Sequence, residues 1–347
     1  MTEPPLVVIT DCDLPGDEPE QILGAAGLRV RRASCRTAEE VAEEAGDATA
    51  LLVQWAPITA SVLDRLDRLR FVSRLGIGHD MIDLAGATAR GIAVANTPDY
   101  CVEEVAAHTI AMVMALARRL PVLDRAVRDG RWSATGDGVG ALRPSRATVA
   151  VIGFGRIGSL VAAHAAALEF RVVVHDPNVD EAAVRAAGHE PSRLEEALAV
   201  ADIVSLHVPL TDLTRRLLNG ETIARMRPGA RIVNTCRGEL IDETALAGAL
   251  ASGHVTAAAL DVFEQEPLSA ASPLRNAPGV LLSPHAAWYS PDSLEELPRR
   301  AARQIVDFLA GRPVPSIVNP EYRARRNRST GPHRPVAGDA EAMTSSD

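Results

Sequence analysis

Short runs of apolar residues alternate with amphipathic stretches along most of the chain. In the first hundred residues, four apolar runs are compact enough to be buried strands, and helical stretches separate them at 38–45 and 58–66. Strands and helices that alternate in this way are typical of a parallel sheet covered by helices on both faces. The four runs are 6–9, 51–53, 71–72 and 92–94.

The stretch from 102 to 120 has the clearest helical pattern. Its apolar residues recur three and four positions apart, between Pro98 and Pro121. This spacing gives a helix one apolar face, and proline is common at helix boundaries. We therefore predict a long buried helix here, followed at 128–146 by a glycine-rich loop or arm.

From residue 147 onward the alternation becomes more regular. Six further apolar runs follow, and helical stretches separate most of them. Six strands match the count of a doubly wound domain that binds a dinucleotide. We expect a closing amphipathic helix at 294–309. The six runs are 148–152, 171–175, 203–208, 231–234, 257–261 and 280–282, and the helical stretches are 157–168, 179–187, 194–199 and 243–251.

The composition excludes several classes of chemistry. All 36 residues in the Lys+Arg count are Arg, so the chain has no amine for a Schiff base and no P-loop or kinase lysine. A net charge of −9 and an aromatic content of only 3% argue against binding of nucleic acid through its phosphates or by base stacking. We therefore expect no nucleic-acid partner.

The cysteines and the apolar runs favour a cytoplasmic protein. The four Cys are far apart and form no C-x-x-C pair, and the chain has no H-E-x-x-H motif, so we expect neither a disulfide framework nor a metal. The acidic first residues do not resemble a signal peptide. We expect no membrane segment, because the longest apolar stretch is shorter than the about 20 residues that span a bilayer.

A G-x-G-x-x-G motif runs from Gly153 to Gly158, between an apolar strand and an Ala-rich helix. Gly153 permits a tight turn, Gly155 lets the backbone approach a pyrophosphate, and Gly158 lets the helix pack close to the strand. The N-terminus of that helix presents unpaired N–H groups to the phosphates. The motif predicts a dinucleotide site that also includes Arg156 and Ile157.

An acidic residue at the end of the next predicted strand distinguishes between the two nicotinamide dinucleotides. Asp176 lies 18 residues after Gly158, and Pro177 and Asn178 follow it. A carboxylate at this position accepts hydrogen bonds from the adenosine ribose hydroxyls and repels the additional phosphate of NADP. We therefore predict NAD(H) as the cofactor.

An arginine, a glutamate and a histidine each follow one of the later predicted strands. Arg237 lies in NTCRG, Glu266 in DVFEQEP and His285 in SPHAAW. Ligands of an open parallel sheet bind beyond the carboxyl ends of its strands. We therefore expect the three side chains to converge beside the nicotinamide.

Six segments between residues 5 and 320 resemble the D-isomer-specific 2-hydroxyacid dehydrogenases: LGIGHDMID, GFGRIG, SLHVPLT, NTCRGELID, ALDVFEQEP and SPHAAWYS. Two segments, PDYC and PHAAWYS, are most similar to the C-terminal-binding-protein branch of that family and its bacterial relatives. The resemblance implies an oxidoreductase that uses NAD. Its reaction interconverts a D-2-hydroxy acid and its 2-oxo acid by hydride transfer.

The resemblance also implies roles for single residues. His285 is the expected acid and base, Glu266 tunes it, and Arg237 holds the substrate carboxylate. An aromatic wall formed by Trp288 favours an apolar or thioether 2-oxo acid. The other expected cofactor contacts are His207, Thr235, Cys236, Asp261 and His285 itself, and the other expected substrate contacts are Arg74, Gly76, Ile77, Gly78 and Trp288.

The fold that the resemblance implies is α/β, with two doubly wound parallel-sheet domains. Residues 1–101 and 294–320 are expected to form a flavodoxin-like substrate domain, and residues 102–293 an inserted Rossmann NAD-binding domain. Residues 321–347 have little to bury and are expected to be a disordered tail. A homodimer is expected through the cofactor domains, with the helix at 102–120 and the arm after it at the contact.

Two other functions stay open at this stage. C-terminal-binding proteins are NAD(H)-sensing binding modules that keep the catalytic triad, so the chain could instead bind a peptide. Oxidation of phosphite or a phosphonate uses the same Arg, Glu and His. Two departures from the family pattern are Cys236, where Ala is frequent, and the segment 142–146, which lacks the usual Gly-containing turn.

Overall fold

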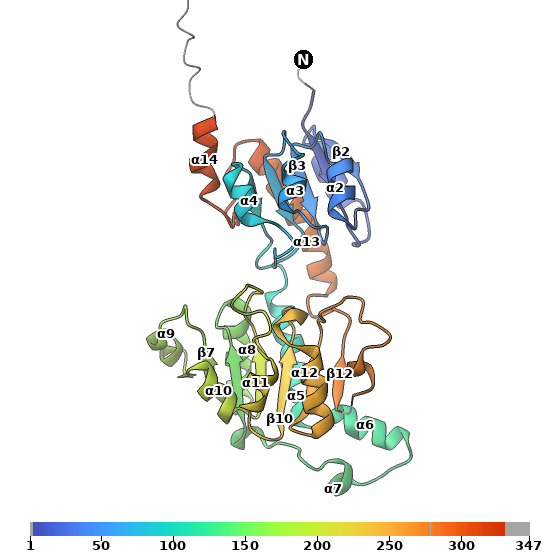
Figure 1. The fold of residues 1–347 in the computed structure, drawn as a ribbon, viewed down its shortest axis with the longest axis vertical. Coiled ribbons are helices and arrows are strands. Elements are labelled where there is room, and N and C mark those ends of the chain that lie inside the picture. Colours follow the sequence, from blue (N-terminus) through green and yellow to red (C-terminus); the bar gives the residue numbers. More distant parts are fainter. Residues whose placement is uncertain (1–2, 278, 330–347) are drawn as a thin grey trace, which may run out of the picture. The chain divides into compact units, whose positions relative to one another are not determined.

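A computed structural model describes residues 3–277 and 279–329, and these residues divide into two units (Figure 1). Unit 1 contains the residues up to Thr97 and those from Leu297 onward, and unit 2 runs from Pro98 to Glu296. The chain therefore passes between the units at 97/98 and at 296/297. The domain boundaries expected from the sequence were 101/102 and 293/294.

Unit 1 is built on a parallel five-stranded sheet with the order β2-β1-β3-β4-β5. This is the flavodoxin-like order 2-1-3-4-5 that was expected. Four of its strands are buried along their whole length, because the sheet is covered on both faces; three of them are apolar throughout, and β4 also buries Ser73 and Arg74. Its elements are β1 (Leu6–Ile9), α1 (Glu18–Ala25), β2 (Arg29–Arg32), α2 (Ala38–Glu44), β3 (Ala50–Val53), α3 (Ala60–Leu63), β4 (Phe71–Arg74), α4 (Leu84–Ala89) and β5 (Ala93–Ala95).

The C-terminal part of the chain completes unit 1. Helix α13 (Pro291–Leu309) packs on β4, where the Ser73 hydroxyl donates to the Ala301 carbonyl at 2.9 Å and the rings of Phe71 and Phe308 stack with centroids 4.3 Å apart. Beyond it, Ile317 forms an antiparallel bridge with Ala95 at the sheet edge. Most of helix α13 therefore belongs to unit 1.

The expectation of disorder from residue 321 onward is wrong for residues 322–329. These residues form helix α14 (Tyr322–Ser329). Tyr322 is buried, and its ring centroid lies 6.3 Å from that of Phe308. One aromatic contact supplies burial that the polar composition of this segment did not suggest. Residues 330–347 lie outside the described residues.

Unit 2 is built on a parallel seven-stranded sheet with the order β12-β11-β10-β9-β6-β7-β8. Counted from β6, this is the Rossmann order 3-2-1-4-5-6 with a seventh strand at one edge. The two-residue strand β8, which contains a proline, was not predicted. The strands are β6 (Thr148–Ile152), β7 (Arg171–His175), β8 (Glu190–Pro191), β9 (Ile203–Leu206), β10 (Ala230–Asn234), β11 (Val255–Leu260) and β12 (Val280–Leu282).

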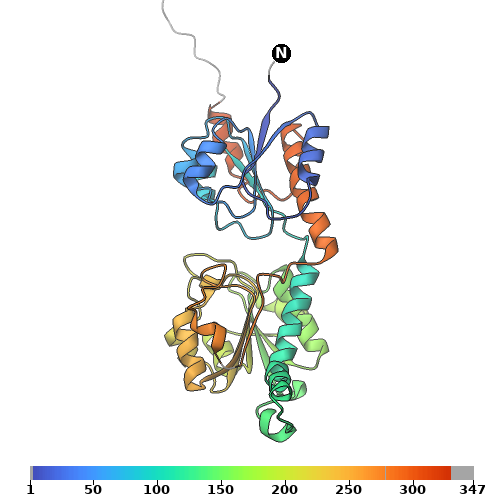
Figure 2. The same cartoon turned by 90° about the vertical axis from the view of Figure 1, so that its right-hand side faces the viewer.

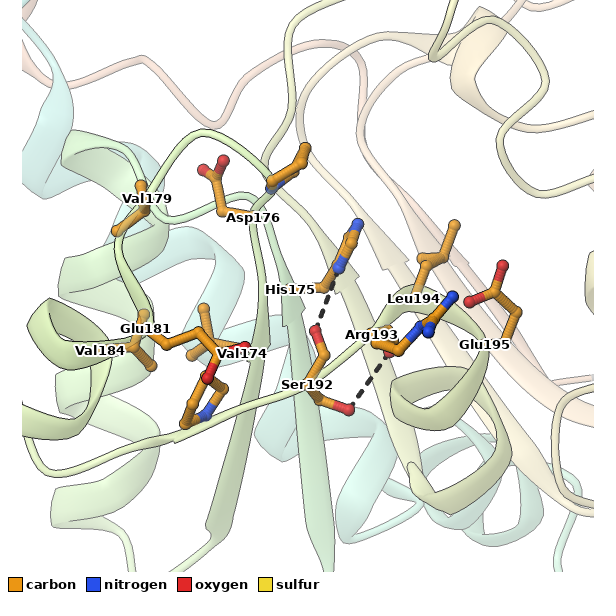
Figure 3. A pocket seen from close by; sticks show the side chains of 12 residues that line it. Val174, His175, Asp176, Val179, Glu181, Val184, Ser192, Arg193, Leu194 and Glu195 are labelled. Atoms are coloured by element: carbon orange, nitrogen blue, oxygen red, sulfur yellow. Dashed lines mark hydrogen bonds between the residues drawn. The ribbon is translucent and has the colours of Figure 1, made fainter.

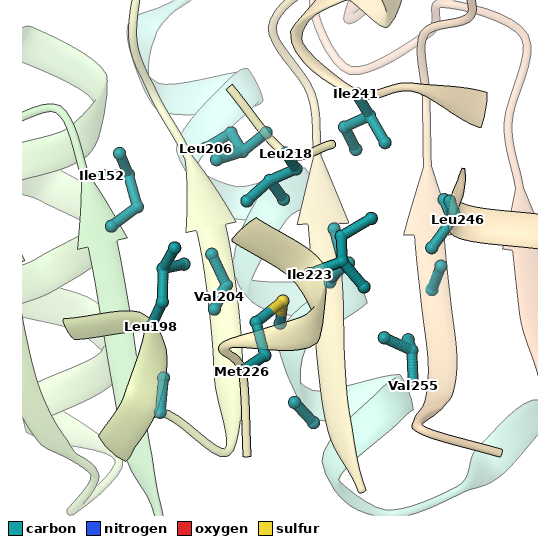
Figure 4. Close-up of a cluster of buried hydrophobic side chains, with 14 of the residues drawn as sticks. Ile152, Leu198, Val204, Leu206, Leu218, Ile223, Met226, Ile241, Leu246 and Val255 are labelled. Atoms are coloured by element: carbon teal, nitrogen blue, oxygen red, sulfur yellow. The ribbon is translucent and has the colours of Figure 1, made fainter. Parts of the chain in front are cut away.

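Helices cover both faces of this sheet (Figure 2). Along β6, Val149 and Val151 belong to the core on one face, while Ala150 and Ile152 belong to the core on the other, because side chains alternate along a strand. Figure 4 shows the second of these cores. The first lies under α5 (Val102–Ala117) and α8 (Arg156–Ala167), and the second under α10 (Leu194–Val200), α11 (Gly220–Ala224) and α12 (Glu243–Ser252).

The predicted helix at 102–120 is α5, which ends three residues earlier than expected, and a second helix that was not predicted follows it. Helix α5 ends at Ala117, and Arg119 adopts a left-handed conformation with φ 56°, so that α6 (Leu120–Arg128) starts in a new direction. The arm at 128–146 contains α7 (Ala134–Asp137) and a 3-10 turn at Pro144–Arg146. Within 3–277 and 279–329, no single helix is long and apolar enough to cross a membrane, although α5 and α6, bent by 61°, meet that test of length and composition together.

Candidate active site

The glycine motif has the geometry of a dinucleotide loop. A Cβ on Gly153 would lie 2.4 Å from the carbonyl oxygen of His207, and a Cβ on Gly158 would lie 2.1 Å from the carbonyl oxygen of Gly153. A Cβ on Gly155 would meet no atom within 4 Å. Two of the glycines therefore permit close packing, whereas the third leaves open space beside the first turn of α8. That space and that helix end suit a pyrophosphate.

Asp176 lies beside this loop at the end of β7. Its carboxylate accepts hydrogen bonds from the amides of Phe154, at 2.8 Å, and Asn178, at 2.9 Å. It also lines a cavity of about 460 Å³ at the carboxyl end of β7 (Figure 3). The segment from Pro191 to Glu195 forms the opposite side, so Arg193 lines the same cavity as Asp176. Sequence analysis did not anticipate this arginine, because it follows a strand that was not predicted.

His207 lies behind the glycine loop. Its Nε2 is 2.8 Å from the Ser205 hydroxyl, and its Nδ1 is buried with no hydrogen-bond partner among the described residues. Burial lowers the pKa of His207 to about 3, so the ring is neutral at physiological pH. A neutral ring at this place can border a cofactor without adding charge.

Two of the expected cofactor contacts follow β10. The hydroxyl oxygens of Thr235 and Thr109 are 2.9 Å apart, and Thr109 donates its proton to the Val105 carbonyl, so Thr235 is the donor in this pair. The Cys236 thiol donates to the Leu206 carbonyl at 3.0 Å, and burial raises the pKa of that thiol to about 12. Cys236 is therefore a neutral thiol rather than a nucleophile.

The Arg237 loop is packed against the loop that leads to Glu266. The Arg237 carbonyl accepts a hydrogen bond from the Asn234 side chain at 2.7 Å. A Cβ on Gly238 would lie only 1.8 Å from the carbonyl carbon of Phe263. Glycine at this position therefore allows two backbone segments, one after β10 and one after β11, to come into contact.

Glu266 and His285 form a hydrogen-bonded pair. His285 Nδ1 lies 2.7 Å from one Glu266 carboxylate oxygen, and the other oxygen accepts the Phe263 amide at 3.0 Å. Both side chains are partly exposed, by 23% for His285 and 34% for Glu266. His285 has φ 51°, in the left-handed region that non-glycine residues rarely adopt. Strain of this kind is often found at functional sites.

Asp261 holds the loop that carries His285. One carboxylate oxygen accepts the Ser283 hydroxyl at 2.5 Å and the Ala286 amide at 2.8 Å, and the other accepts the Ala287 amide at 2.8 Å. The Asp261 carbonyl accepts the His285 amide at 2.7 Å. The side chain is only 1% exposed. Asp261 therefore fixes the loop on both sides of His285.

In unit 1, the expected substrate residues form one cluster. The buried Arg74 guanidinium lies 5.2 Å from the centre of the Trp55 ring and donates to the Leu75 carbonyl. Gly76 has φ 140°, and a Cβ there would lie 1.5 Å from an Arg74 nitrogen. The Ile77 carbonyl accepts from the Asn96 side chain at 2.8 Å, and Gly78 follows. Trp55 was not predicted, and only its contact with Arg74 reveals it.

Two of the few aromatic residues lie beside Trp288 in unit 2. Its ring centroid lies 6.3 Å from that of Tyr100 and 5.7 Å from that of Tyr289. Trp288 lies three residues after His285 on the same loop. Among residues 3–277 and 279–329, no group of three His, Cys, Asp or Glu side chains could hold a metal ion.

Comparisons with known proteins agree with this geometry. Residues 110–287 match the family described as D-isomer specific 2-hydroxyacid dehydrogenase, NAD binding domain, and all of them lie in unit 2. The chain is 38% identical over 267 residues to a glyoxylate reductase of Korarchaeum cryptofilum, covering 76% of this chain and 80% of that protein.

Two further comparisons extend the likeness. A D-3-phosphoglycerate dehydrogenase of Mycobacterium tuberculosis is 39% identical over 274 residues, covering 79% of this chain. The matched part of this chain covers only 51%, about half, of the length of that relative. A solved D-lactate dehydrogenase from Aquifex aeolicus, complexed with NAD and lactic acid, superposes with a TM-score of 0.80 at 30% identity, covering 88% of this chain and 96% of that chain. Unit 2 is thus an NAD-binding domain, and the chain belongs to the D-isomer-specific 2-hydroxyacid dehydrogenase family.

Proposed function

We propose that the protein is an NAD-dependent dehydrogenase that interconverts a D-2-hydroxy acid and its 2-oxo acid. The observation that carries this proposal is the 2.7 Å hydrogen bond between His285 Nδ1 and Glu266, on loops that follow the neighbouring strands β11 and β12. A carboxylate-paired histidine at the carboxyl edge of a dinucleotide-binding sheet is suited to proton transfer beside a hydride acceptor. The relatives named as glyoxylate reductase and D-lactate dehydrogenase support the substrate class.

His285 supplies the proton in this proposal. The bond to Glu266 fixes the proton on Nδ1 and orients the ring, so Nε2 is the nitrogen that exchanges a proton with the substrate. In reduction, the carbonyl oxygen takes this proton from Nε2 while C2 receives a hydride. In oxidation, Nε2 takes the proton of the hydroxyl while C2 loses the hydride. When bound, NAD(H) provides or accepts that hydride at its nicotinamide.

The residues that would hold the cofactor are those of the glycine loop, with Arg156 and Ile157 at the start of α8. Asp176 favours NAD over NADP, because its carboxylate repels an additional phosphate at the adenosine ribose. We keep His207, Thr235, Cys236 and Asp261 as residues that border the cofactor.

Arg237 and the unit 1 cluster would hold the substrate carboxylate. The planar fork of an Arg side chain matches the two oxygens of a carboxylate. The backbone N–H groups of Ile77 and Gly78 and the Arg74 guanidinium provide further donors, whereas the Gly76 N–H already donates to the Arg74 carbonyl at 3.0 Å. An aromatic wall at Trp288 favours an apolar or thioether side chain on the 2-oxo acid over a small or charged one.

We also propose a homodimer that forms through the arm of unit 2. Helix α6 and the arm at 128–146 together expose four large apolar side chains, at Leu120, Val127, Trp132 and Val139, which are 54%, 54%, 89% and 67% exposed. Apolar side chains that gather on one exposed segment favour a protein contact. A cytoplasmic location belongs to the same proposal, because all four cysteines are free thiols.

The test measures NADH oxidation by the purified chain against a panel of 2-oxo acids. The panel includes glyoxylate and 2-oxo acids with small, branched, thioether and aromatic side chains. In the opposite direction, D-3-phosphoglycerate is assayed with NAD. We expect turnover that is highest for apolar side chains. His285→Asn lowers kcat by about 10²-fold to 10⁴-fold, the range for loss of a general acid.

Two controls make the result decisive. NADH binding, measured by fluorescence, must be the same in His285→Asn as in the wild type, so that the loss is in the chemical step. NADH binding without turnover on any acid would contradict the enzyme proposal and favour a sensor. Turnover confined to phosphite or a phosphonate would contradict the carboxylic-acid substrate.

A further inference from the structure

A second histidine lies under the loop that carries His285. His108 is on α5, and its Nε2 is 3.2 Å from the Ser283 hydroxyl oxygen and 3.9 Å from an Asp261 carboxylate oxygen. Ser283 Oγ is in turn 2.5 Å from that same oxygen of Asp261. No role assigned above uses His108, although it connects a core helix to the candidate active site.

The direction of each hydrogen bond follows from the chemistry of the groups. A carboxylate only accepts, so Ser283 donates its single hydroxyl proton to Asp261. The Ser283 oxygen can then only accept from His108, which requires the proton on Nε2. His108, Ser283 and Asp261 therefore form a chain of hydrogen bonds with one consistent polarity.

This chain ends on the backbone around His285. Asp261 fixes the amides of Ala286 and Ala287 with its carboxylate and the amide of His285 with its carbonyl. The φ of 51° at His285 is costly and persists only where its surroundings enforce it. If Asp261 turns, both amides after His285 lose their acceptor, and the imidazole no longer faces Glu266 at the same angle.

We propose that His108 is a positioning residue, which acts through Ser283 and Asp261 to hold His285 in its strained conformation. The inference rests on the proposed function, since it assigns a support to the same acid and base. A purely structural histidine would need only to fill space in the core. This one is 31% exposed and turns its Nε2–H toward the buried carboxylate that organises the loop.

The first experiment compares His108→Leu with His108→Gln. Leucine fills similar space but donates no hydrogen bond, whereas the glutamine amide can place a donor near the position of Nε2. We expect His108→Leu to lower kcat by about 10-fold to 100-fold, as for a slightly misplaced catalytic group. We expect KM for NADH to stay within about twofold, the solvent isotope effect on kcat to increase, and His108→Gln to recover most of the activity.

A double mutant tests the route of the effect. Ser283→Ala breaks the same chain of hydrogen bonds. The loss of kcat in the double mutant, which carries both His108→Leu and Ser283→Ala, must therefore not exceed the larger of the losses in the two single mutants. If the fold-loss of kcat in the double mutant equals the product of the two single fold-losses, the proposal is overturned. It is also overturned if His108→Gln has the melting temperature of the wild type but does not recover activity.

A spectroscopic readout separates this inference from the proposed function. The proton that His285 Nδ1 shares with Glu266 gives a downfield proton resonance, assigned by its loss in His285→Asn. We expect this resonance to shift or broaden in His108→Leu and to return in His108→Gln. If the wild type turns over no acid, the proposed function fails, yet this resonance still decides the positioning role. An unchanged resonance in a folded His108→Leu overturns it.

Discussion

The two units use the same device at equivalent places. In unit 1, Asp11 follows β1, is buried, and accepts the amides of Gln54 and Ala56 at 3.1 Å and that of Trp55 at 2.5 Å. In unit 2, Asp261 follows β11 and holds residues 283–287. Each carboxylate fixes the loop after the parallel neighbouring strand, β3 beside β1 and β12 beside β11.

What the two fixed loops carry is different. The loop on Asp261 carries His285, a titratable residue in a strained conformation and paired with Glu266. The loop on Asp11 carries Trp55, whose ring stacks with Arg74. In the proposed function, one copy of the device orients the proton donor and the other supports the cluster that would contact the substrate. Under the proposed function, selectivity can therefore change in unit 1 while the chemistry in unit 2 stays intact.

The largest expected effect comes from two glycines beside the arginines of the two units. Gly238→Ala places a Cβ 1.8 Å from backbone that cannot move aside, so we expect a loss of about 3 kcal/mol or more in the free energy of unfolding. In Gly76→Ala the added Cβ meets only the flexible end of the Arg74 side chain. The loss then comes from backbone strain at φ 140°, and we expect it to be smaller, about 1–3 kcal/mol. Urea unfolding measures both, and equal losses would mean that Arg74 is as rigid as backbone.

The second test replaces the two carboxylates. Asp11→Asn and Asp261→Asn each leave backbone amides short of an acceptor, which costs about 1–3 kcal/mol of stability. We expect Asp261→Asn also to lower kcat strongly, while Asp11→Asn raises the KM of the acid and leaves kcat within about threefold. Steady-state kinetics at matched stability separate the two. A similar fall in kcat for Asp11→Asn would break the division between the units.

The third test separates recognition of the two ligands. Asp176→Ala is expected to raise the KM for NAD about tenfold and to relax the preference over NADP, because Arg193 lines the same cavity and can attract a phosphate. Arg193→Leu added to Asp176→Ala is the matched control and should remove the gain with NADP. Arg74→Met should instead raise the KM of the acid about tenfold and leave the KM for NAD unchanged. An increase in the KM of the acid in Asp176→Ala, or in the KM for NAD in Arg74→Met, would contradict the division of roles between the two units.

The smallest expected effect concerns His207 and pH. The pKa of His207 is lowered from 6.5 to about 3 by burial, so the unfolded chain takes up a proton at mildly acidic pH that the folded chain refuses. Its contribution to stability is therefore complete above pH 6.5 and is lost as the pH falls toward 3. At pH 5.5 the loss is about 1.4 kcal/mol.

His207→Gln removes this titration and is the measurement that checks it. Urea unfolding at several pH values should show a flatter decline below pH 6.5 for the variant than for the wild type. Parallel curves would mean that His207 is protonated in the folded chain. The effect belongs to unit 2 alone, and the same variant should leave the KM of the acid unchanged.

Much of this arrangement could be predicted from the chain itself, because the signals are local. Apolar runs gave the buried strands of both sheets, and motifs that follow strand ends predicted Glu266 and His285 as neighbours. Two of the four edge strands were missed: β2 is rich in Arg and half exposed, and β8 has two residues. Such strands bury too little to leave a periodic signal.

The supports of the site were missed for a different reason. Asp11 contacts residues 43 to 45 positions away, and His108 contacts Ser283 over 175 positions. Only the folded sheet brings these residues together, so no spacing in the chain announces them. The proposed catalytic groups are recognisable by residue type and motif, whereas the groups that hold them are recognisable only by their hydrogen bonds.

The C-terminal segment of unit 1 has a consequence for aggregation. The Asn319 side chain accepts the Val94 amide at 2.8 Å and donates to the Ile92 carbonyl at 2.9 Å, while the Val318 amide donates to the Val94 carbonyl at 2.9 Å. Residues 316–319 thereby cover the edge of β5. A chain that ends before residue 316 uncovers the peptide groups of that edge, which become a template for pairing between molecules.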